Sequence, residues 1–260
     1  MSHILTYYTS KTDENDPQRA SVLSIETDLP KLYDACFTTY IFCSFNKRVA
    51  VWAQFLLQFA IIGRSSDVTT HCPTINKVQF PTSEIDYLPD GLPRFIVIFL
   101  DDWKSRPTWH KSQTPNGYRL RLYANHLDTR FCPVHWLLLH WHLEGIARDD
   151  QTGPIIAHCV QDQYRKDLKK LFNKCGFAYT SHSVCRSAAQ WGRRCGADLV
   201  ILRNVGRWVS FRSLLFYIAE AEKEARIAIR NNNNVDPIFR YWIFDTDTMI
   251  DTMDKPSNIY

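Results

Sequence analysis

The fold is decided by the stretch TSHSVCRSAAQWGRRCGADLVILRNVGRWVSFRSLLFY, residues 180–217, in which helix signals alternate with glycine stops. Ser181 or Ser183 is expected to cap a helix that lasts to Arg194, because a serine hydroxyl accepts a hydrogen bond from a free N–H group of the first turn. Gly196 is expected to end this helix. The stretch therefore predicts a helix with a histidine near its start and several arginines along its length.

A turn and two further helices complete this stretch. A short helix is expected over residues 198–205, with Gly206 at its end, and a long helix over residues 209–230. The turn between them contains Trp208, and Tyr217 follows this tryptophan by nine residues. A histidine and arginines on one helix, followed by a tyrosine on another, form the set that a phosphodiester-cleaving site needs when a tyrosine hydroxyl attacks.

Upstream of this stretch, the hydrophobic pattern predicts more helices and a small sheet. The run FIVIFL is apolar throughout, as in a strand covered on both faces, whereas YRLRLY alternates arginine with leucine. The fold class expected is therefore α+β, mainly helical, with a small antiparallel β-sheet. The expected helices cover residues 31–42, 47–62, 133–144 and 161–174, a short helix opens at 66–68, and the expected strands cover 77–80, 94–100 and 118–123.

The chain of 260 residues is 45% hydrophobic and can bury a sizeable core. Residues 1–28 are polar and are expected to form a flexible leader, and residues 29–230 are expected to form one domain. Residues 231–260 begin with four asparagines as a linker and continue into an aromatic tail. So much aromatic surface is expected to pack on the body or on a neighbour.

The charge of the chain is mildly basic, at +4, which permits nucleic-acid binding without demanding it. Its distribution is more informative than its total. Between residues 164 and 230 there are fourteen lysines and arginines against five acidic residues. The positive field is therefore expected to arise from the C-terminal half.

The eight cysteines form no C-x-x-C motif, and none pairs with a histidine at metal-ligand spacing, so no metal site is expected. Scattered cysteines are typical of reduced thiols in the cytosol or nucleus. The apolar run over residues 49–62 is shorter than a membrane span and contains two glutamines, so no membrane partner is expected.

Five motifs occur in a fixed order along the chain. They are Gly63-Arg64-Ser-Ser-Asp67, a lysine on a β-hairpin, Cys132-Pro-Val, Ser181-His182-Ser183, and Gly206-Arg207-Trp208 followed by Tyr217. In this order they resemble the motifs of tyrosine recombinases, and most closely those of the Crypton-like transposon recombinases of eukaryotes. The resemblance covers roughly residues 30–225.

This resemblance implies the tyrosine recombinase catalytic-domain fold and an activity that cuts and rejoins DNA strands through a 3′-phosphotyrosine, with no metal and no nucleotide cofactor. It implies double-stranded DNA as the partner and a homo-oligomer on DNA. Exchange of a C-terminal segment would join the subunits, and Phe239–Phe244 is a candidate for that contact. The expected location is the nucleus if the organism is a eukaryote, and otherwise the cytoplasm.

The resemblance also assigns roles to residues. Tyr217 is the nucleophile, Arg64 is one phosphate clamp, and His182 transfers a proton or donates to the phosphate. Trp208 takes the place of a second histidine, and Asp67 supports the arginine or the histidine. Residue chemistry agrees, because a tyrosine with a pKa of about 10 attacks poorly at neutral pH, and arginines match phosphate oxygens with paired planar donors.

A hairpin lysine would protonate the 5′-hydroxyl leaving group. Lys104 and Lys111 both fit this role, and the sequence does not decide between them.

One departure from the family pattern concerns a second arginine. The family places an arginine three residues after the histidine, where this chain has Cys185, and Arg186 lies one step further. Positions i+3 and i+4 lie on roughly the same helix face, so Arg186 is a candidate replacement. Losing a preorganised charge donor costs about 3–4 kcal/mol. We expect cleavage to be severely weakened or lost, DNA binding to be retained, and Cys185→Arg to raise activity.

Two alternatives to an active recombinase stay open. The chain is either a catalytically inactive DNA-binding protein derived from a mobile element, or a protein unrelated to DNA in which the motif order is a coincidence.

A second departure concerns the N-terminal side, because only about 30 residues precede the match, too few for the helical domain that closes the family's clamp around DNA. We expect the chain to be a fragment of a larger element or a remnant without that clamp.

Overall fold

The structure is a computed structural model, and it describes residues 21–39, 41–69, 77–79, 95–100, 118–145, 156, 160–208 and 210–219. Within residues 77–79, 97–100 and 118–121, it describes the backbone alone.

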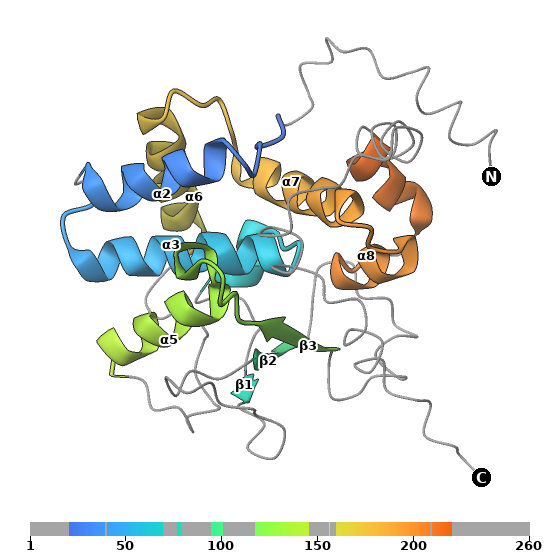
Figure 1. Cartoon of the computed structure of the whole chain (residues 1–260), viewed down its shortest axis with the longest axis horizontal. Helices are drawn as coiled ribbons and strands as arrows, with labels where there is room; N and C mark the ends of the chain where they lie inside the picture. Colours follow the sequence, from blue (N-terminus) through green and yellow to red (C-terminus); the bar gives the residue numbers. More distant parts are fainter. Residues whose placement is uncertain are drawn as a thin grey trace.

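The described residues form a mainly helical α+β structure with a small antiparallel sheet, which confirms the predicted class (Figure 1). A last helical segment covers residues 211–219. The other elements are α2 (Asp28–Thr38), α3 (Phe45–Ala60), the 3₁₀ turn η1 (Ser65–Val68), β1 (Lys77–Gln79), β2 (Phe95–Leu100), β3 (Tyr118–Tyr123), the 3₁₀ turn η2 (Thr129–Phe131), α5 (Pro133–Leu143), α6 (Gln161–Lys174), α7 (Ser181–Arg194) and α8 (Leu199–Val205).

Helix α3 forms the centre of the core. It lies between α2 and α5 in Figure 1 and also contacts α6 and α7. Every residue from Val51 to Ala60 is buried, including Gln54 and Gln58. Each large apolar side chain removed from water in this way contributes about 1.5–3 kcal/mol. Because α3 has no solvent face along this stretch, its glutamines and its C-terminal carbonyls need partners inside the protein.

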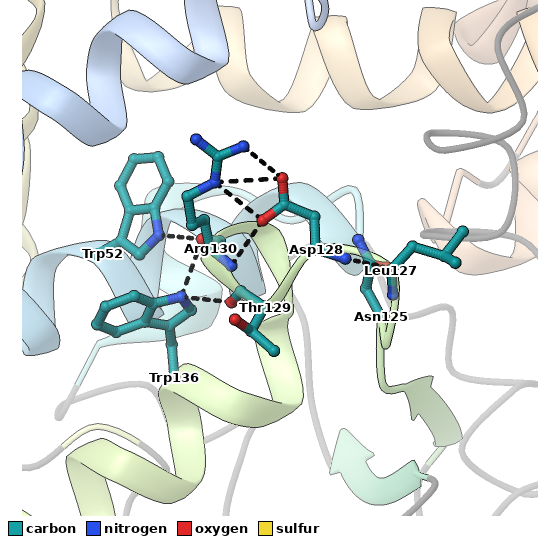
Figure 2. Close-up of polar contacts among 7 residues, drawn as sticks. All are labelled: Trp52, Asn125, Leu127, Asp128, Thr129, Arg130 and Trp136. Atoms are coloured by element: carbon teal, nitrogen blue, oxygen red, sulfur yellow. Dashed lines mark hydrogen bonds and ion pairs between the residues drawn. The ribbon is translucent and has the colours of Figure 1, made fainter.

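Two tryptophans fix the start of α5 against α3 (Figure 2). The indole N–H groups of Trp52 and Trp136 both donate to the backbone oxygen of Arg130, at 2.8 Å and 2.9 Å. The Arg130 side chain forms an ion pair with Asp128, which also caps η2 through the Arg130 N–H group. The aromatic side chains thus gain hydrogen bonds as well as burial.

The sheet has the order β1-β2-β3, and both pairs of strands are antiparallel. In the β2–β3 pair, Phe95 lies opposite Tyr123 and Leu100 lies opposite Tyr118. Lys104 and Lys111 follow β2 and precede β3, and both lie outside the described residues.

Several details differ from the sequence-based predictions, and α3 covers Phe45–Ala60 where residues 47–62 were expected. Helix α2 ends at Thr38 instead of residue 42, and the Thr39 hydroxyl donates to the Ala35 carbonyl, a bond that competes with further helical bonding. Helix α7 is capped by Thr180 and not by Ser181 or Ser183, because the Thr180 hydroxyl accepts from the first-turn N–H groups.

Two residues that precede α2 pack against the body of the protein. Leu23 and Ile25 are buried, and the Leu23 N–H group donates to Ser187 Oγ of α7 at 2.8 Å. Residues 1–20 and 220–260, which contain most of the predicted leader, the linker and the aromatic tail, lie outside the described part of the chain. None of the helices within the described residues has the length and apolar character that crossing a bilayer requires.

Candidate functional site

The candidate site centres on a contact between a tyrosine and a histidine. Tyr217 belongs to the last helical segment, and His182 lies in the first turn of α7. The Tyr217 hydroxyl oxygen is 2.9 Å from His182 Nε2, and the ring centroids are 5.3 Å apart. With Nε2 unprotonated, this nitrogen accepts a hydrogen bond from the phenol, which is the arrangement of a base beside a nucleophile.

Helix capping fixes the position of His182. The Thr180 hydroxyl accepts hydrogen bonds from the N–H groups of His182 and Ser183, and the Ser183 hydroxyl accepts from the Thr180 N–H group. This reciprocal box is a stable way to begin a helix. The imidazole therefore leaves the backbone from a well-defined first turn.

Trp208 also contacts the tyrosine ring. The Trp208 and Tyr217 ring centroids are 4.9 Å apart, with 49° between the ring planes. A Cβ atom on Gly206 would come within 2.1 Å of the Trp208 ring, far inside van der Waals contact. Glycine is therefore needed at position 206 so that the indole can fold back over the turn.

Arg64 enters the site from the turn after α3. Ile62, just after the helix end, has a φ of 49°, an uncommon left-handed conformation for a β-branched residue. Arg64 then occupies the N-cap position of η1, where its backbone N–H group donates to Asp67 Oδ2 at 2.8 Å. This bond fixes the backbone from which the Arg64 side chain departs.

The buried side chain of Gln58 connects the Arg64 turn to the start of α7. Its Nε2 donates to the carbonyl oxygens of Gly63, at 3.0 Å, and Ser181, at 2.8 Å. Its Oε1 accepts from the Tyr164 hydroxyl of α6 at 2.8 Å. One amide thus bonds the residue before Arg64, the residue before His182 and a third helix.

A buried ion pair joins the Arg64 turn to the Trp208 turn. Arg207 Nη2 lies 2.7 Å from Asp67 Oδ2, and the two side chains are 5% and 7% exposed. The same carboxylate oxygen accepts the Arg64 N–H group. Removing one partner of such a pair leaves a buried charge and costs about 3–5 kcal/mol.

Cys185 is part of the packing between α3 and α7. It is 4% exposed, and its thiol donates to the Ile62 carbonyl oxygen, with 3.2 Å between Sγ and O. Burial raises the pKa of this thiol to about 12, so it stays protonated. This geometry argues against a gain from Cys185→Arg, because an arginine here would overfill the core beside the charges of Arg207, Asp67 and Arg64.

Arg186 also contributes to the site, as its i+4 position relative to His182 suggests. It is buried, and its positive charge lowers the pKa of both His182 and Tyr217. Arg64 acts on the same two groups in the same direction. Two guanidinium groups therefore lie within electrostatic reach of the Tyr217–His182 pair.

The pKa shifts of the pair have opposite directions. Burial is the largest cause for His182, and together with Arg64 and Arg186 it lowers the imidazole pKa below its ordinary 6.5. Burial raises the pKa of Tyr217 to about 12, against the smaller lowering effect of the two arginines. At neutral pH the imidazole is therefore neutral and the phenol carries its proton. This is the protonation state in which His182 can accept the phenol proton.

The structure brings together seven of the nine residues predicted from the sequence. Lys104 and Lys111 are the two that lie outside the described residues. The seven are Arg64, Asp67, His182, Cys185, Arg186, Trp208 and Tyr217. Within the described residues, no group of three His, Cys, Asp or Glu side chains is arranged to hold a metal ion.

Sequence reasoning missed the support of the site. Gln58, Tyr164 and Arg207 were not singled out, yet they bond the turns that carry the predicted residues. The only signal for Gln58 in the sequence is a polar residue within the apolar run 49–62, which it shares with Gln54, and Arg207 stands out only as part of a turn motif.

The basic helix α6 adjoins the Arg64 turn. Arg165 Nε and Gln161 Nε2 each donate to Ser65 Oγ at 3.1 Å. Arg165 and Lys169, one helical turn apart, are both exposed. A positive surface therefore continues from the candidate site along α6.

No protein-family model matches the sequence, and a comparison with curated proteins gave no match. Among solved structures, the chain is similar to XerA recombinase, with 12% identity and a TM-score of 0.48 over 85% of this chain and 67% of that one. It is similar to XerH site-specific recombinase bound to palindromic difH substrate, with 14% identity and a TM-score of 0.49 over 84% and 56%. It is also similar to FLP recombinase in a Holliday junction complex, with 15% identity and a TM-score of 0.47 over 81% and 51%.

The chain thus spans between about half and two thirds of the length of these recombinases. At TM-scores below 0.5, the similarities transfer no activity and no residue role to this chain.

The Gln58 contacts predict an order of stability losses. Tyr164→Phe leaves the Gln58 Oε1 atom without its donor and should reduce the free energy of unfolding by about 1–3 kcal/mol. Gln58→Leu removes the donor from two carbonyls and should reduce the free energy of unfolding by more than Tyr164→Phe does. Urea denaturation measures both values. An equal or larger loss for Tyr164→Phe would contradict the central role of Gln58.

The pKa shift of His182 predicts the outcome of an NMR titration. NMR should give a His182 pKa below 6.5, and Arg64→Gln should raise it because one repulsive cation is removed. The His182→Gln variant assigns the signal, and Lys31→Gln, beside Phe177, serves as a control that should leave the pKa unchanged. Since the unfolded chain binds this proton more readily, the stability that His182 contributes is present above pH 6.5 and is lost as the pH falls. A pKa above 6.5 would contradict this account.

Proposed function

We propose that this chain is a DNA-cleaving and rejoining enzyme of the tyrosine recombinase type, with Tyr217 as its nucleophile. The observation that carries the proposal is the 2.9 Å contact between the Tyr217 hydroxyl and His182 Nε2, with the charges of Arg64 and Arg186 acting on both groups. A phenol, a neutral base and two guanidinium groups suit attack on an anionic phosphodiester.

The proposed step exchanges one phosphorus–oxygen bond for another. The Tyr217 oxygen attacks the phosphorus of a DNA phosphodiester, and its proton passes to His182 Nε2. The new bond is a 3′-phosphotyrosine, and the bond to the 5′ oxygen breaks. The departing 5′ oxygen takes a proton to become a hydroxyl, and Lys104 or Lys111 supplies it. Rejoining is the reverse reaction.

The arginines supply the charge that this step needs. Arg64 and Arg186 stabilise the phosphorane as negative charge accumulates on its equatorial oxygens. The Tyr217 phenol, whose pKa is raised to about 12, does not ionise by itself at neutral pH, so proton transfer to His182 accompanies attack. Trp208 holds the tyrosine ring through the contact between the two rings.

Double-stranded DNA is the proposed substrate, and α6 is its proposed contact beyond the site. Arg165 donates to Ser65 beside Arg64, so a DNA strand bound at the site would pass near this end of the helix. Exposed lysines and arginines along a helix are suited to phosphate contacts that fix the register without reading bases.

A catalytically inactive DNA-binding protein is the second candidate, and Cys185 is the observation that favours it. The buried thiol is neutral and bonds to a backbone carbonyl, so it offers no charge to a phosphate. In this candidate the site binds the DNA backbone, and Tyr217 does not complete the attack.

Four broader proposals rest on the sequence resemblance alone. The chain derives from a Crypton-like mobile element, it assembles as a homo-oligomer on DNA, and it acts in the nucleus if the organism is a eukaryote. Residues 29–230 are the proposed catalytic domain.

The nucleophile predicts a covalent product. Nicked suicide duplexes, randomised around the nick, should trap wild-type protein as a DNA adduct, and Tyr217→Phe should abolish the adduct because the attacking oxygen is gone. Denaturing gels detect the adduct, and peptide mapping should place the phosphotyrosine at Tyr217.

Tyr33→Phe is the matched control, because Tyr33 lies in the aromatic cluster around Trp52 and Trp136, and its adduct yield should equal that of the wild type. An adduct that persists in Tyr217→Phe would exclude Tyr217 as the nucleophile. Salt-sensitive binding without any adduct in the wild type would select the inactive candidate.

The α6 contact predicts a change in salt dependence. The double variant Arg165→Gln/Lys169→Gln should bind duplex DNA more weakly, and the slope of log K against log salt should shrink by about 0.9 for each lost phosphate contact. Fluorescence anisotropy over a salt series measures the slope. Lys31→Gln, near Phe177 at the other end of α6, should keep the wild-type slope. An unchanged slope in the double variant would remove α6 from the DNA interface.

A further inference from the structure

Two residues other than glycine have a positive φ within the described part of the chain, and both lie beside the candidate site. Ile62, with φ of 49°, comes two residues before Arg64, and Arg207, with φ of 55°, comes directly before Trp208. A side chain persists in this conformation only where its surroundings over-determine it. The two turns that carry Arg64 and Trp208 are therefore held by strong local contacts.

One carboxylate oxygen joins these two turns. Asp67 Oδ2 accepts the Arg64 N–H group at 2.8 Å and Arg207 Nη2 at 2.7 Å. Arg207 Nη1 also donates to the Val205 carbonyl oxygen at 3.3 Å, which binds the guanidinium to its own turn. Both charged side chains are buried, so water cannot replace either partner readily.

The position of Trp208 depends on this turn. Its backbone N–H group donates to the Arg203 carbonyl oxygen at 2.9 Å, and its ring folds back over Gly206 to contact Tyr217. Arg207 and Trp208 are consecutive residues, so no intervening residue can compensate for a movement of the Arg207 backbone. A shift of the Arg207 backbone would therefore move the indole that contacts the tyrosine.

We propose that Arg207 is a positioning residue of this site, whose buried ion pair with Asp67 joins the Arg64 turn to the Trp208 turn and so holds the Trp208 ring against Tyr217. The inference rests on the proposed function for its effect on cleavage. Arg207 does not contact the phosphate in this account, because its charge is already paired with Asp67.

Cysteine alkylation tests the ion pair in the protein without DNA. The main variant is Arg207→Gly/Asp67→Asn, in which glycine suits the positive φ and asparagine still accepts from the Arg64 N–H group. Cys185 reports on the pair, because it lies within the electrostatic field of Arg207, Asp67 and Arg64. Cys36, buried in the core near Arg48, reports on global unfolding.

Iodoacetamide labelling followed by peptide mapping should show Cys185 reacting about tenfold faster or more in the double variant, with Cys36 unchanged. Arg203→Gln, which removes an arginine stacked on Phe211, should leave Cys185 protected. Arg207→Lys should restore part of the protection. Unchanged protection of Cys185 in the double variant, or an equal rise at Cys36, would overturn the proposal.

Cleavage kinetics test the positioning role. The double variant should bind duplex DNA within about twofold of the wild type, while its single-turnover rate of adduct formation falls by about 10²-fold. Gly206→Ala should displace Trp208 and slow the same step while leaving Cys185 protected. An unchanged rate in the double variant would overturn the positioning role. If the wild-type protein forms no Tyr217 adduct, the proposed function is wrong. The Cys185 labelling would then still decide whether the ion pair holds the two turns.

Discussion

The structure depends on how the buried turn that follows α3 is satisfied inside the protein. Its carbonyls lie beyond the helix, and burial denies them water. Here the Ile62 carbonyl accepts the Cys185 thiol, and the Gly63 carbonyl accepts the Gln58 amide. Because Cys185 belongs to α7, satisfying this turn also places α7 beside α3 (Figure 1). The turn that carries Arg64 and the helix that carries His182 are thus adjacent because the Cys185 thiol donates to a backbone carbonyl of that turn.

The electrostatics of the site follow from this packing. Partial burial would leave a tyrosine and a histidine both neutral, and the two nearby arginines act on them differently. For His182 they add to the effect of burial and disfavour the imidazolium, whereas for Tyr217 they oppose burial and favour the phenolate. A bound phosphate would offset this positive charge, which would make the imidazolium less costly. The same phosphate would also disfavour the phenolate, because it offsets the charge that lowers the pKa of Tyr217.

The elements and the site were predictable from the sequence to different degrees. The bounds of α6 and β3 agree with their hydrophobic patterns, and the fixed spacing of Trp208 and Tyr217 marks one part of the site. The supporting contacts leave no such pattern. Arg207 pairs with Asp67 across 140 positions, and Tyr164 bonds Gln58 across 106. Contacts of this range depend on the packing of whole helices, which local propensity does not encode.

Cys185 has a structural role that the sequence does not indicate. In the sequence, it stands out only because the resemblance predicts an arginine at this position. In the structure, it is the donor for a buried carbonyl, and the guanidinium of Arg207 lies close enough to act on the thiol. A cation placed at position 185 would leave the Ile62 carbonyl without its thiol donor and would add a charge beside those of Arg207, Asp67 and Arg64. An arginine at position 185 is therefore compatible with this packing only if the Asp67–Arg207 pair changes as well.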